Sequence, residues 1–225
     1  MKSNLLALAL AATLYATGAQ ASVPVTNLID DIYGTGTGSF ELGTFTPIGT
    51  GNWSFQSLNN GATTIEGWTV GGAGVDWLST AYYGASDGVH AVDLNWFTGG
   101  AGLVSITLPT VQGATYALSF GAAAISGSGN TNLGSVSAGS LADYFAPAFS
   151  DNFFSHVFYT QNYQFIANGS NTVLTIAAST VAGYGPVIDD VKVSFVSAPV
   201  PEPETYALML AGLGLVGVTA RRRAR

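Results

Sequence analysis

The chain has 225 residues, of which only 8% are charged and 48% are hydrophobic, with 29 glycines and no cysteine. This composition excludes overall disorder, and the missing cysteines exclude a disulfide framework, thiolate catalysis and Cys-ligated zinc. Of the 13 acidic residues, Glu202 and Glu204 lie in the C-terminal tail. The body between the two ends of the chain therefore has 11 acidic residues and one base, Lys192, and a net charge of about −10. Such a body repels phosphate backbones, which excludes nucleic-acid binding.

The N-terminus has the three parts of a secretion signal. Lys2 gives a positive start, Leu5 to Leu14 form a short apolar run, and Ala19-Gln20-Ala21 offers small residues where a signal peptidase cleaves. We therefore predict that residues 1–21 are a signal peptide and that the mature chain begins at Ser22. The body of the protein is then outside the cytoplasm.

Between residues 22 and 198, apolar side chains alternate with polar ones, and no long segment has the 3.6-residue period of a helix. Alternation of this kind is typical of half-buried strands; it is seen in Val104/Ile106/Leu108, Tyr116/Leu118/Phe120, Leu174/Ile176 and Val191/Val193/Phe195. Turn dipeptides separate such runs at Asn60-Gly61, Asp87-Gly88 and Asn168-Gly169. The pattern predicts one all-β domain over residues 22–198, a sandwich of two antiparallel sheets. Residues 125–140, rich in Gly, Ser and Asn, are expected to be a long loop or a weak edge hairpin.

Seven short segments stand in an order that resembles the choice-of-anchor C family of exported bacterial domains. They are Gly38–Gly43, Ile65–Val70, Val75–Trp77, Ser86–Gly88, Val92–Asn95, Gly113–Phe120 and Gly185–Val191. The resemblance implies a jelly-roll, galactose-binding-like β-sandwich of a kind that often binds polysaccharide, and it brings no settled activity. Trp96-Phe97 and the stretch from Ile125 to Phe154 depart from the pattern, which makes them candidate positions for a binding face.

The residues give no sign of catalysis. Hydrolysis of sugars needs two carboxylates facing each other across a cleft, and the acids of this chain show no pair at a telling spacing. His90 and His156 are far apart in sequence and lack a metal-binding spacing, and no Gly-x-Ser-x-Gly elbow is present. We therefore predict that the protein is not an enzyme.

Three acids are candidates for a structural calcium ion, which prefers several carboxylate and carbonyl oxygens. They are Glu41 near the opening strand and Asp189 and Asp190 in the last one; in related carbohydrate-binding jelly rolls, the matching positions hold such an ion. Strand alternation would place Asp189 on the same face as Val191 and Val193, with Asp190 facing out. The alternative is that these acids cap turns or accept backbone amides without a metal.

Sugar recognition commonly uses aromatic rings stacked on a pyranose, with polar neighbours that bond its hydroxyls. Four aromatic residues in loop-like sequence are candidates: Trp53, Tyr82, Tyr83 and Trp96. Trp68 and Trp77 lie in strand-like sequence and are expected in the core. For each loop aromatic, the alternative is packing.

The C-terminus carries a Pro-Glu-Pro motif (Pro201, Glu202, Pro203), then an uncharged stretch over residues 206–220, then the cluster Arg221, Arg222, Arg223 and Arg225. At ~1.5 Å per residue the uncharged stretch spans about 22 Å, short of a hydrocarbon core of roughly 30 Å. This layout resembles the PEP-CTERM sorting signal and implies an exosortase partner in a Gram-negative bacterium. It further implies a short transmembrane helix that anchors the chain transiently in the inner membrane, cleavage near the Pro-Glu-Pro motif, and release to the surface or matrix. An ordinary single-span anchor is the alternative.

Together these features predict three segments: a signal peptide over 1–21, a β-sandwich over 22–198 and a sorting segment over 199–225. The function predicted first is a non-catalytic carbohydrate-binding module associated with exopolysaccharide. A structural or adhesive surface protein without a sugar site is the second hypothesis, and a polysaccharide-acting enzyme the third.

Overall fold

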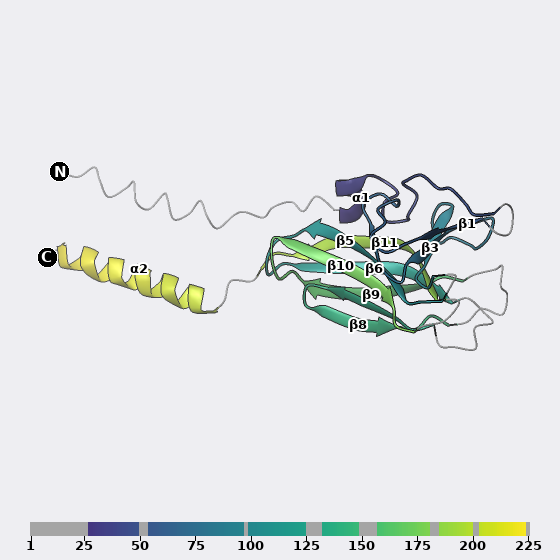
Figure 1. Ribbon diagram of the computed structural model, residues 1–225. Coiled ribbons are helices and arrows are strands. Elements are labelled where there is room, and N and C mark those ends of the chain that lie inside the picture. Colours follow the sequence, from purple (N-terminus) through teal and green to yellow (C-terminus); the bar gives the residue numbers. More distant parts are fainter. Residues whose placement is uncertain are drawn as a thin grey trace.

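The computed structural model describes residues 27–49, 54–96, 99–124, 132–148, 157–180, 185–199 and 203–223. The predicted signal peptide lies outside these residues. The described body is a sandwich of two antiparallel β-sheets, as predicted (Figure 1). Its elements are α1 (Leu28–Tyr33), β1 (Phe55–Leu58), β2 (Thr69–Gly72), β3 (Val75–Ser79), β4 (His90–Asp93), β5 (Gly102–Pro109), β6 (Thr115–Ala124), β7 (Gly134–Ala138), β8 (Leu141–Phe145), β9 (Tyr159–Ile166), β10 (Asn171–Ala178), β11 (Pro186–Ser197) and α2 (Pro203–Arg223).

The two sheets differ in size. One has six strands in the order β1-β3-β4-β11-β6-β9, and the other has five in the order β2-β5-β10-β7-β8. The Asn168-Gly169 turn joins β9 to β10 and therefore links one sheet to the other, and Asn60-Gly61 does the same between β1 and β2. Within the stretch 125–140, expected as a loop or weak edge hairpin, the described residues form β7, which pairs with β10 on one side and on the other with β8, an edge strand beyond that stretch.

The main core lies between the sheets and is filled by the inward residues of alternating strands. Strand β5 shows the pattern most clearly, since Val104, Ile106 and Leu108 are buried while their neighbours are not. Each such aliphatic side chain contributes roughly 1.5–3 kcal/mol on burial. The predicted inward residues of β6 and β10 are buried in the same core, which confirms the alternation argument for these strands.

Two tryptophans hold the segment that enters the sandwich. The indole N–H of Trp68 donates to the carbonyl oxygen of Thr37 at 2.8 Å, and that of Trp77 donates to the carbonyl oxygen of Phe40 at 3.0 Å. Phe40 has φ +59, a conformation that costs a bulky residue energy. Its fully buried ring lies 5.0 Å from the ring of Trp68, so packing and hydrogen bonding together stabilise the turn. Trp68 and Trp77 are core residues, as predicted.

Strand β11 contains a β-bulge that reverses the side-chain alternation. Asp189 pairs with Gly121 and Lys192 with Ser119, so two residues of β11 face one of β6, and Asp190 between them has φ +53. Ile188 therefore shares the inner face with Val191 and Val193, whereas Asp189 lies on the outer face. The prediction that Asp189 shares a face with Val191 and Val193 is wrong, because uninterrupted alternation does not hold across a bulge.

A second, smaller core covers one end of the outer face of the six-stranded sheet. Leu78 and Ala91 pair across β3 and β4, and both point away from the main core, since their neighbours Trp77 and Val92 belong to it. The segment over residues 80–89 closes over them and contributes Tyr82 and Tyr83. This end of the sheet is thus buried on both faces.

Helix α2 ends in Arg221, Arg222 and Arg223, and its side chains over residues 207–223 are all exposed. Pro203 is its first residue, where a missing N–H costs no hydrogen bond. The predicted C-terminal helix is therefore present. In the part of the chain that the structure describes, however, no helix has the length and apolar character needed to cross a membrane.

Candidate functional site

The open part of the outer face of the six-stranded sheet carries a groove of about 510 Å³. Its walls and floor come from three adjacent strands, β11, β6 and β9. They are lined by Ala117, Leu118, Ser119, Asn162, Tyr163, Gln164, Lys192 and Ser194. Sequence reasoning did not find this groove, because no single strand contains it.

The strand register explains the shape of the groove. Lys192, Ser119 and Asn162 form one row across the three strands, and Ser194, Ala117 and Gln164 form the next. The middle residue of each row is small and the flanking residues are mostly longer, so the central strand forms a low floor between raised sides. The resulting surface offers hydroxyl, amide and ammonium groups within one shallow depression.

Asp190, in the bulge of β11, holds the side chain of Lys192 at one side of the groove. Its Nζ lies 2.7 Å from each carboxylate oxygen of Asp190. The hydrogen bond to Asp190 is the main reason that the pKa of Lys192 is raised, so the ammonium stays charged and paired. The pair leaves the groove nearly neutral although the body is acidic.

The segment over residues 80–89 closes one end of the groove. Gly121 is the next outward position of β6 after Ser119, and a Cβ there would lie 3.1 Å from the hydroxyl of Ser86. Two carboxylates hold this segment by its backbone. Asp189 Oδ2 accepts from the amides of Ser86 at 2.6 Å and Asp87 at 2.9 Å.

Glu41 holds the other half of the same segment, since its Oε1 accepts from the amides of Val89 at 2.8 Å and His90 at 2.7 Å. Gly88 lies directly against this carboxylate and has φ +70, where a side chain would collide with Glu41. Glu41, near the start of the domain, and Asp189, in its last strand, thus both hold the loop over residues 80–89.

These contacts bear on the predicted calcium site. Asp189 is fully buried, its Oδ1 accepts from the amide of Asp190 at 2.6 Å, and burial raises its pKa to about 7 against the lowering effect of three amides. Three carboxylate oxygens of Glu41 and Asp189 thus face N–H donors, which a cation would have to displace, and Asp190 pairs with Lys192. The arrangement fits the alternative, in which the acids hold the backbone without a metal. Among the described residues, no group of three or more acidic or histidine side chains is arranged to hold one; calcium binding stays a prediction.

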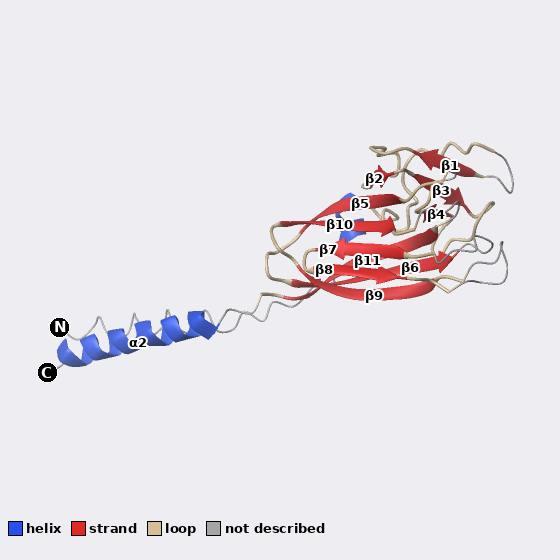
Figure 2. Cartoon of the chain, turned by 60° about the horizontal axis from the view of Figure 1, so that its bottom comes forward, coloured by secondary structure: helices blue, strands red, loops and turns tan. Residues whose placement is uncertain are grey.

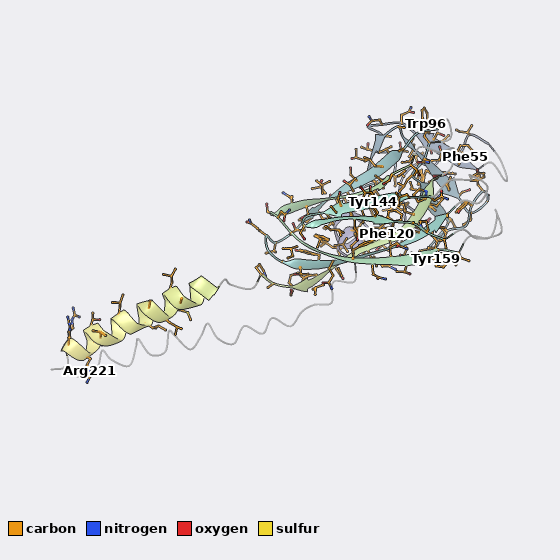
Figure 3. The ribbon with its side chains drawn as sticks, turned by 90° about the horizontal axis from the view of Figure 1, so that it is seen from below. Phe55, Trp96, Phe120, Tyr144, Tyr159 and Arg221 are labelled. Atoms are coloured by element: carbon orange, nitrogen blue, oxygen red, sulfur yellow. The ribbon has the colours of Figure 1, made fainter. Side chains whose placement is uncertain are left out.

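The aromatic residues predicted to stack on sugar do not form one exposed face. Tyr82 and Tyr83 are 7% and 1% exposed and pack in the second core, so a sugar cannot reach their rings. Trp96 is partly buried beside Gly74, and its indole N–H has no hydrogen-bond partner among the described residues. Figure 3 shows Trp96 on the opposite side of the sandwich from Tyr159 of β9, and Trp96 does not line the groove. Trp53 lies outside the described residues.

Two acids that are remote in sequence meet on the outer face beneath the second core. Asp76 and Asp93 are direct cross-strand partners in β3 and β4, with 5% and 3% of their surface exposed. Asp93 Oδ1 accepts from the amides of Asn95 at 2.8 Å and Gly185 at 3.0 Å. Burial raises the pKa of Asp93 well above its ordinary value, the two amides lower it, and the charge of Asp76 raises it further. The pair is closed off from solvent and is a structural feature rather than a cleft for substrate.

The raised pKa values of Asp93 and Asp189 predict that the stability of the protein falls as the pH rises. Because the pKa of Asp93 is raised on folding, the native state holds a proton that the unfolded state releases above about pH 4. Stability is then greatest at or below the unfolded pKa and falls as pH rises through the folded one, by up to about 1.4 kcal/mol per pH unit for each such group. Asp189 adds a loss in the same direction between its ordinary pKa and about 7.

We therefore expect urea unfolding to show lower stability at pH 7 than at pH 5. Asp93→Asn keeps an oxygen for the two amides and removes the titration, so it should reduce this difference and stabilise the protein at pH 7. A difference that is unchanged in Asp93→Asn would show that other groups cause it.

The residues of the predicted sorting motif are only partly described. Pro201 and Glu202 lie outside the described residues, whereas Pro203 begins helix α2 and Arg221, Arg222 and Arg223 form its last turn. The apolar run and the basic cluster that carried the resemblance therefore lie along one helix.

Two family models match the chain. Residues 36–194 match a protein family of unknown function, DUF642, and residues 199–223 match the PEP-CTERM protein-sorting motif. The second match confirms the interpretation of the tail, and the motif marks an exported protein that an exosortase processes. The first covers the segments quoted for the choice-of-anchor C family, whose name is not confirmed. No curated protein matches the chain.

Solved structures similar to the chain include carbohydrate-binding modules. A family 35 module from Clostridium thermocellum has a TM-score of 0.43 and 14% identity, over 62% of this chain and 97% of that one. A tandem CBM22 domain of Xyn10C from Paenibacillus barcinonensis has a TM-score of 0.45 and 21% identity, over 66% and 46%. TmCBM61, in complex with β-1,4-galactotriose, has a TM-score of 0.40 and 15% identity, over 72% and 96%.

Proposed function

The chain belongs to the DUF642 family, and we propose that its β-sandwich is a non-catalytic module that binds an uncharged polysaccharide outside the cell. The observation that carries this proposal is the groove over β11, β6 and β9. Its hydroxyl, amide and ammonium groups are suited to the many hydroxyls of a sugar chain, and its open form admits a polymer from the side. The PEP-CTERM motif supports the location, because an exported protein meets glycans of the cell surface and matrix.

The electrostatics favour an uncharged ligand. The body carries a net charge of about −10, and Asp190 already pairs with Lys192, the one base between Lys2 and Arg221. A polyanionic glycan would therefore meet repulsion with little compensation. Hydrogen bonds to neutral hydroxyls carry no such penalty.

Several observations favour binding over catalysis. Glycoside hydrolysis requires two carboxyl groups on either side of the scissile bond, and the residues that line the groove include no aspartate or glutamate. Asp76 and Asp93, which are cross-strand partners, are buried under the second core. The described lining of the groove thus supports binding of a glycan over its hydrolysis.

Filling the floor of the groove tests the proposal. Ser119→Leu places a larger, apolar side chain on the groove floor, between Lys192 and Asn162. We expect it to weaken binding to a neutral exopolysaccharide at least about tenfold, because the sugar loses hydrogen bonds and space. Ser137→Leu is the matched control, since Ser137 is an exposed strand residue of the other sheet. Affinity electrophoresis or calorimetry with neutral and uronate-containing polysaccharides gives the readout, and melting curves verify folding.

An equal loss in both variants would place the binding surface elsewhere. If the wild type binds no polysaccharide, the second hypothesis, an adhesive or structural surface protein without a sugar site, takes the place of the proposal. Preferential binding of uronate polymers would overturn the argument from charge.

A further inference from the structure

Strand β9, at one edge of the six-stranded sheet, lacks the features that prevent exposed edge strands from pairing with another chain. Proteins protect exposed edges with short strands, charges, prolines or bulges. The edge strands β1 and β2 have four residues each, and β8 has five and an exposed aspartate, Asp143. Strand β9 has eight residues, Tyr159–Ile166, with no charge, proline or glycine, and it pairs with β6 without a register shift. Figure 2 shows β9 along the margin of the sandwich.

The hydrogen bonds of Ile166 show which backbone groups of β9 point outward. The Ile166 amide donates to the hydroxyl of Ser140, and the Ile166 carbonyl accepts from the Ser140 amide, so both point away from β6. Because these directions alternate along an antiparallel strand, the N–H and C=O groups of Thr160, Asn162 and Gln164 also point outward. These three have no backbone hydrogen-bond partner on that side among the described residues.

We propose that β9 is a self-association edge, at which a second copy of this chain pairs antiparallel with β9 and extends the six-stranded sheet across both copies. Ser140 closes the Ile166 end, so within the described part of the chain residues 159–165 have no strand paired on that side, and Asn162 is the centre of this open segment. An antiparallel pair centred there obeys a two-fold axis, as a closed dimer requires. The outward groups of Thr160 then meet those of Gln164 in the other copy.

The strand is complementary to itself in this register. Asn162 faces Asn162, Thr160 faces Gln164, and Gln161 faces Tyr163, so hydroxyl, amide and aromatic groups meet and no like charges oppose each other. Asp143 lies on the neighbouring edge strand β8, and its charge contributes to the raised pKa of Tyr163 after the larger effect of burial. Two acidic bodies therefore meet along an uncharged strand, and salt should strengthen the dimer by screening the remaining repulsion.

Sedimentation velocity of the purified full chain, in a mild detergent and without glycan, tests this pairing. We expect twice the monomer mass at high protein concentration, dissociation on dilution, and tighter association at higher salt. Thr160→Pro removes an outward N–H that β6 does not use, and each dimer loses two hydrogen bonds, so dimerisation should weaken about tenfold with folding retained. Thr160 does not line the groove, so glycan binding by the variant monomer should not change.

A second variant tests the centre of the register. Asn162→Asp places two like charges face to face and should weaken the dimer at neutral pH, with recovery on acidification. Ser137→Asp adds the same charge on the other sheet and should leave the dimer unchanged. A chain that stays monomeric throughout, or a dimer that neither β9 variant weakens, would overturn the proposal. Because the experiment contains no glycan, its result is independent of the proposed sugar binding.

Discussion

Asp189→Ala should lower the free energy of unfolding by about 3 kcal/mol, because three backbone amides lose their buried acceptor. Two of these amides, those of Ser86 and Asp87, belong to the segment that closes the second core and ends the groove. The loss is a large part of the stability of an ordinary domain and should appear as a drop in melting temperature of roughly 6–12 °C. Chemical unfolding at neutral pH gives the free energy directly.

Two further variants separate the role of Asp189 from a general effect of charge. Asp143→Ala removes an exposed carboxylate whose one hydrogen bond among the described residues is from the adjacent amide of Tyr144, and it should change stability by less than about 0.5 kcal/mol. Asp189→Asn keeps one acceptor oxygen and should fall between the two alanine variants. If Asp189→Ala were no more damaging than Asp143→Ala, the carboxylate would not be what holds residues 80–89.

The loop over residues 80–89 also connects the stability of the domain to its proposed binding surface. Asp189 is the outward residue of β11 next to Lys192 along the groove side of the sheet, separated from it by the bulge. The same distortion that turns Asp189 under the loop places Asp190 beside Lys192. One irregularity of one strand thus sets both the closed end of the groove and the charge balance at its side.

The sequence predicted those parts of the fold that depend on neighbours within one strand. The alternation of Val104, Ile106 and Leu108 identifies an inward face, because the two faces of a sandwich sheet differ in polarity. The bulge at Asp190 has no such signal, since an aspartate with φ +53 looks like any strand or turn residue. The assignment of Asp189 to the inner face failed for that reason.

The groove could not be predicted for a related reason. Its rows join residues from β11, β6 and β9, such as Lys192, Ser119 and Asn162, which become neighbours only through strand order and register. Loop-like sequence also does not identify exposed aromatic residues, because Tyr82 and Tyr83 lie in such sequence and pack in the second core. A turn-rich segment that covers a sheet face buries its aromatic residues as a strand does.

Trp77→Ala should lower the free energy of unfolding by about 3–5 kcal/mol. This is the largest effect that we expect from any single residue that lies in the segment around Phe40 or packs against it. The Trp77 ring is fully buried and lies 5.1 Å from Phe45 and 4.9 Å from His90, so its removal leaves a cavity between the opening segment and β4. The change also deprives the carbonyl of Phe40 of its hydrogen bond, where the backbone is already in an unfavourable conformation.

Trp77→Phe separates these two contributions, because it keeps an aromatic ring and removes the N–H. We expect it to cost about 1–3 kcal/mol, the value of leaving the Phe40 carbonyl unpaired, plus a small packing term. Trp96→Phe is the matched control, since the indole N–H of Trp96 has no partner among the described residues and its loss should be nearly neutral. If urea unfolding gave the same small change for both phenylalanine variants, packing alone would hold the opening turn, and the hydrogen bond to Phe40 would add nothing to stability.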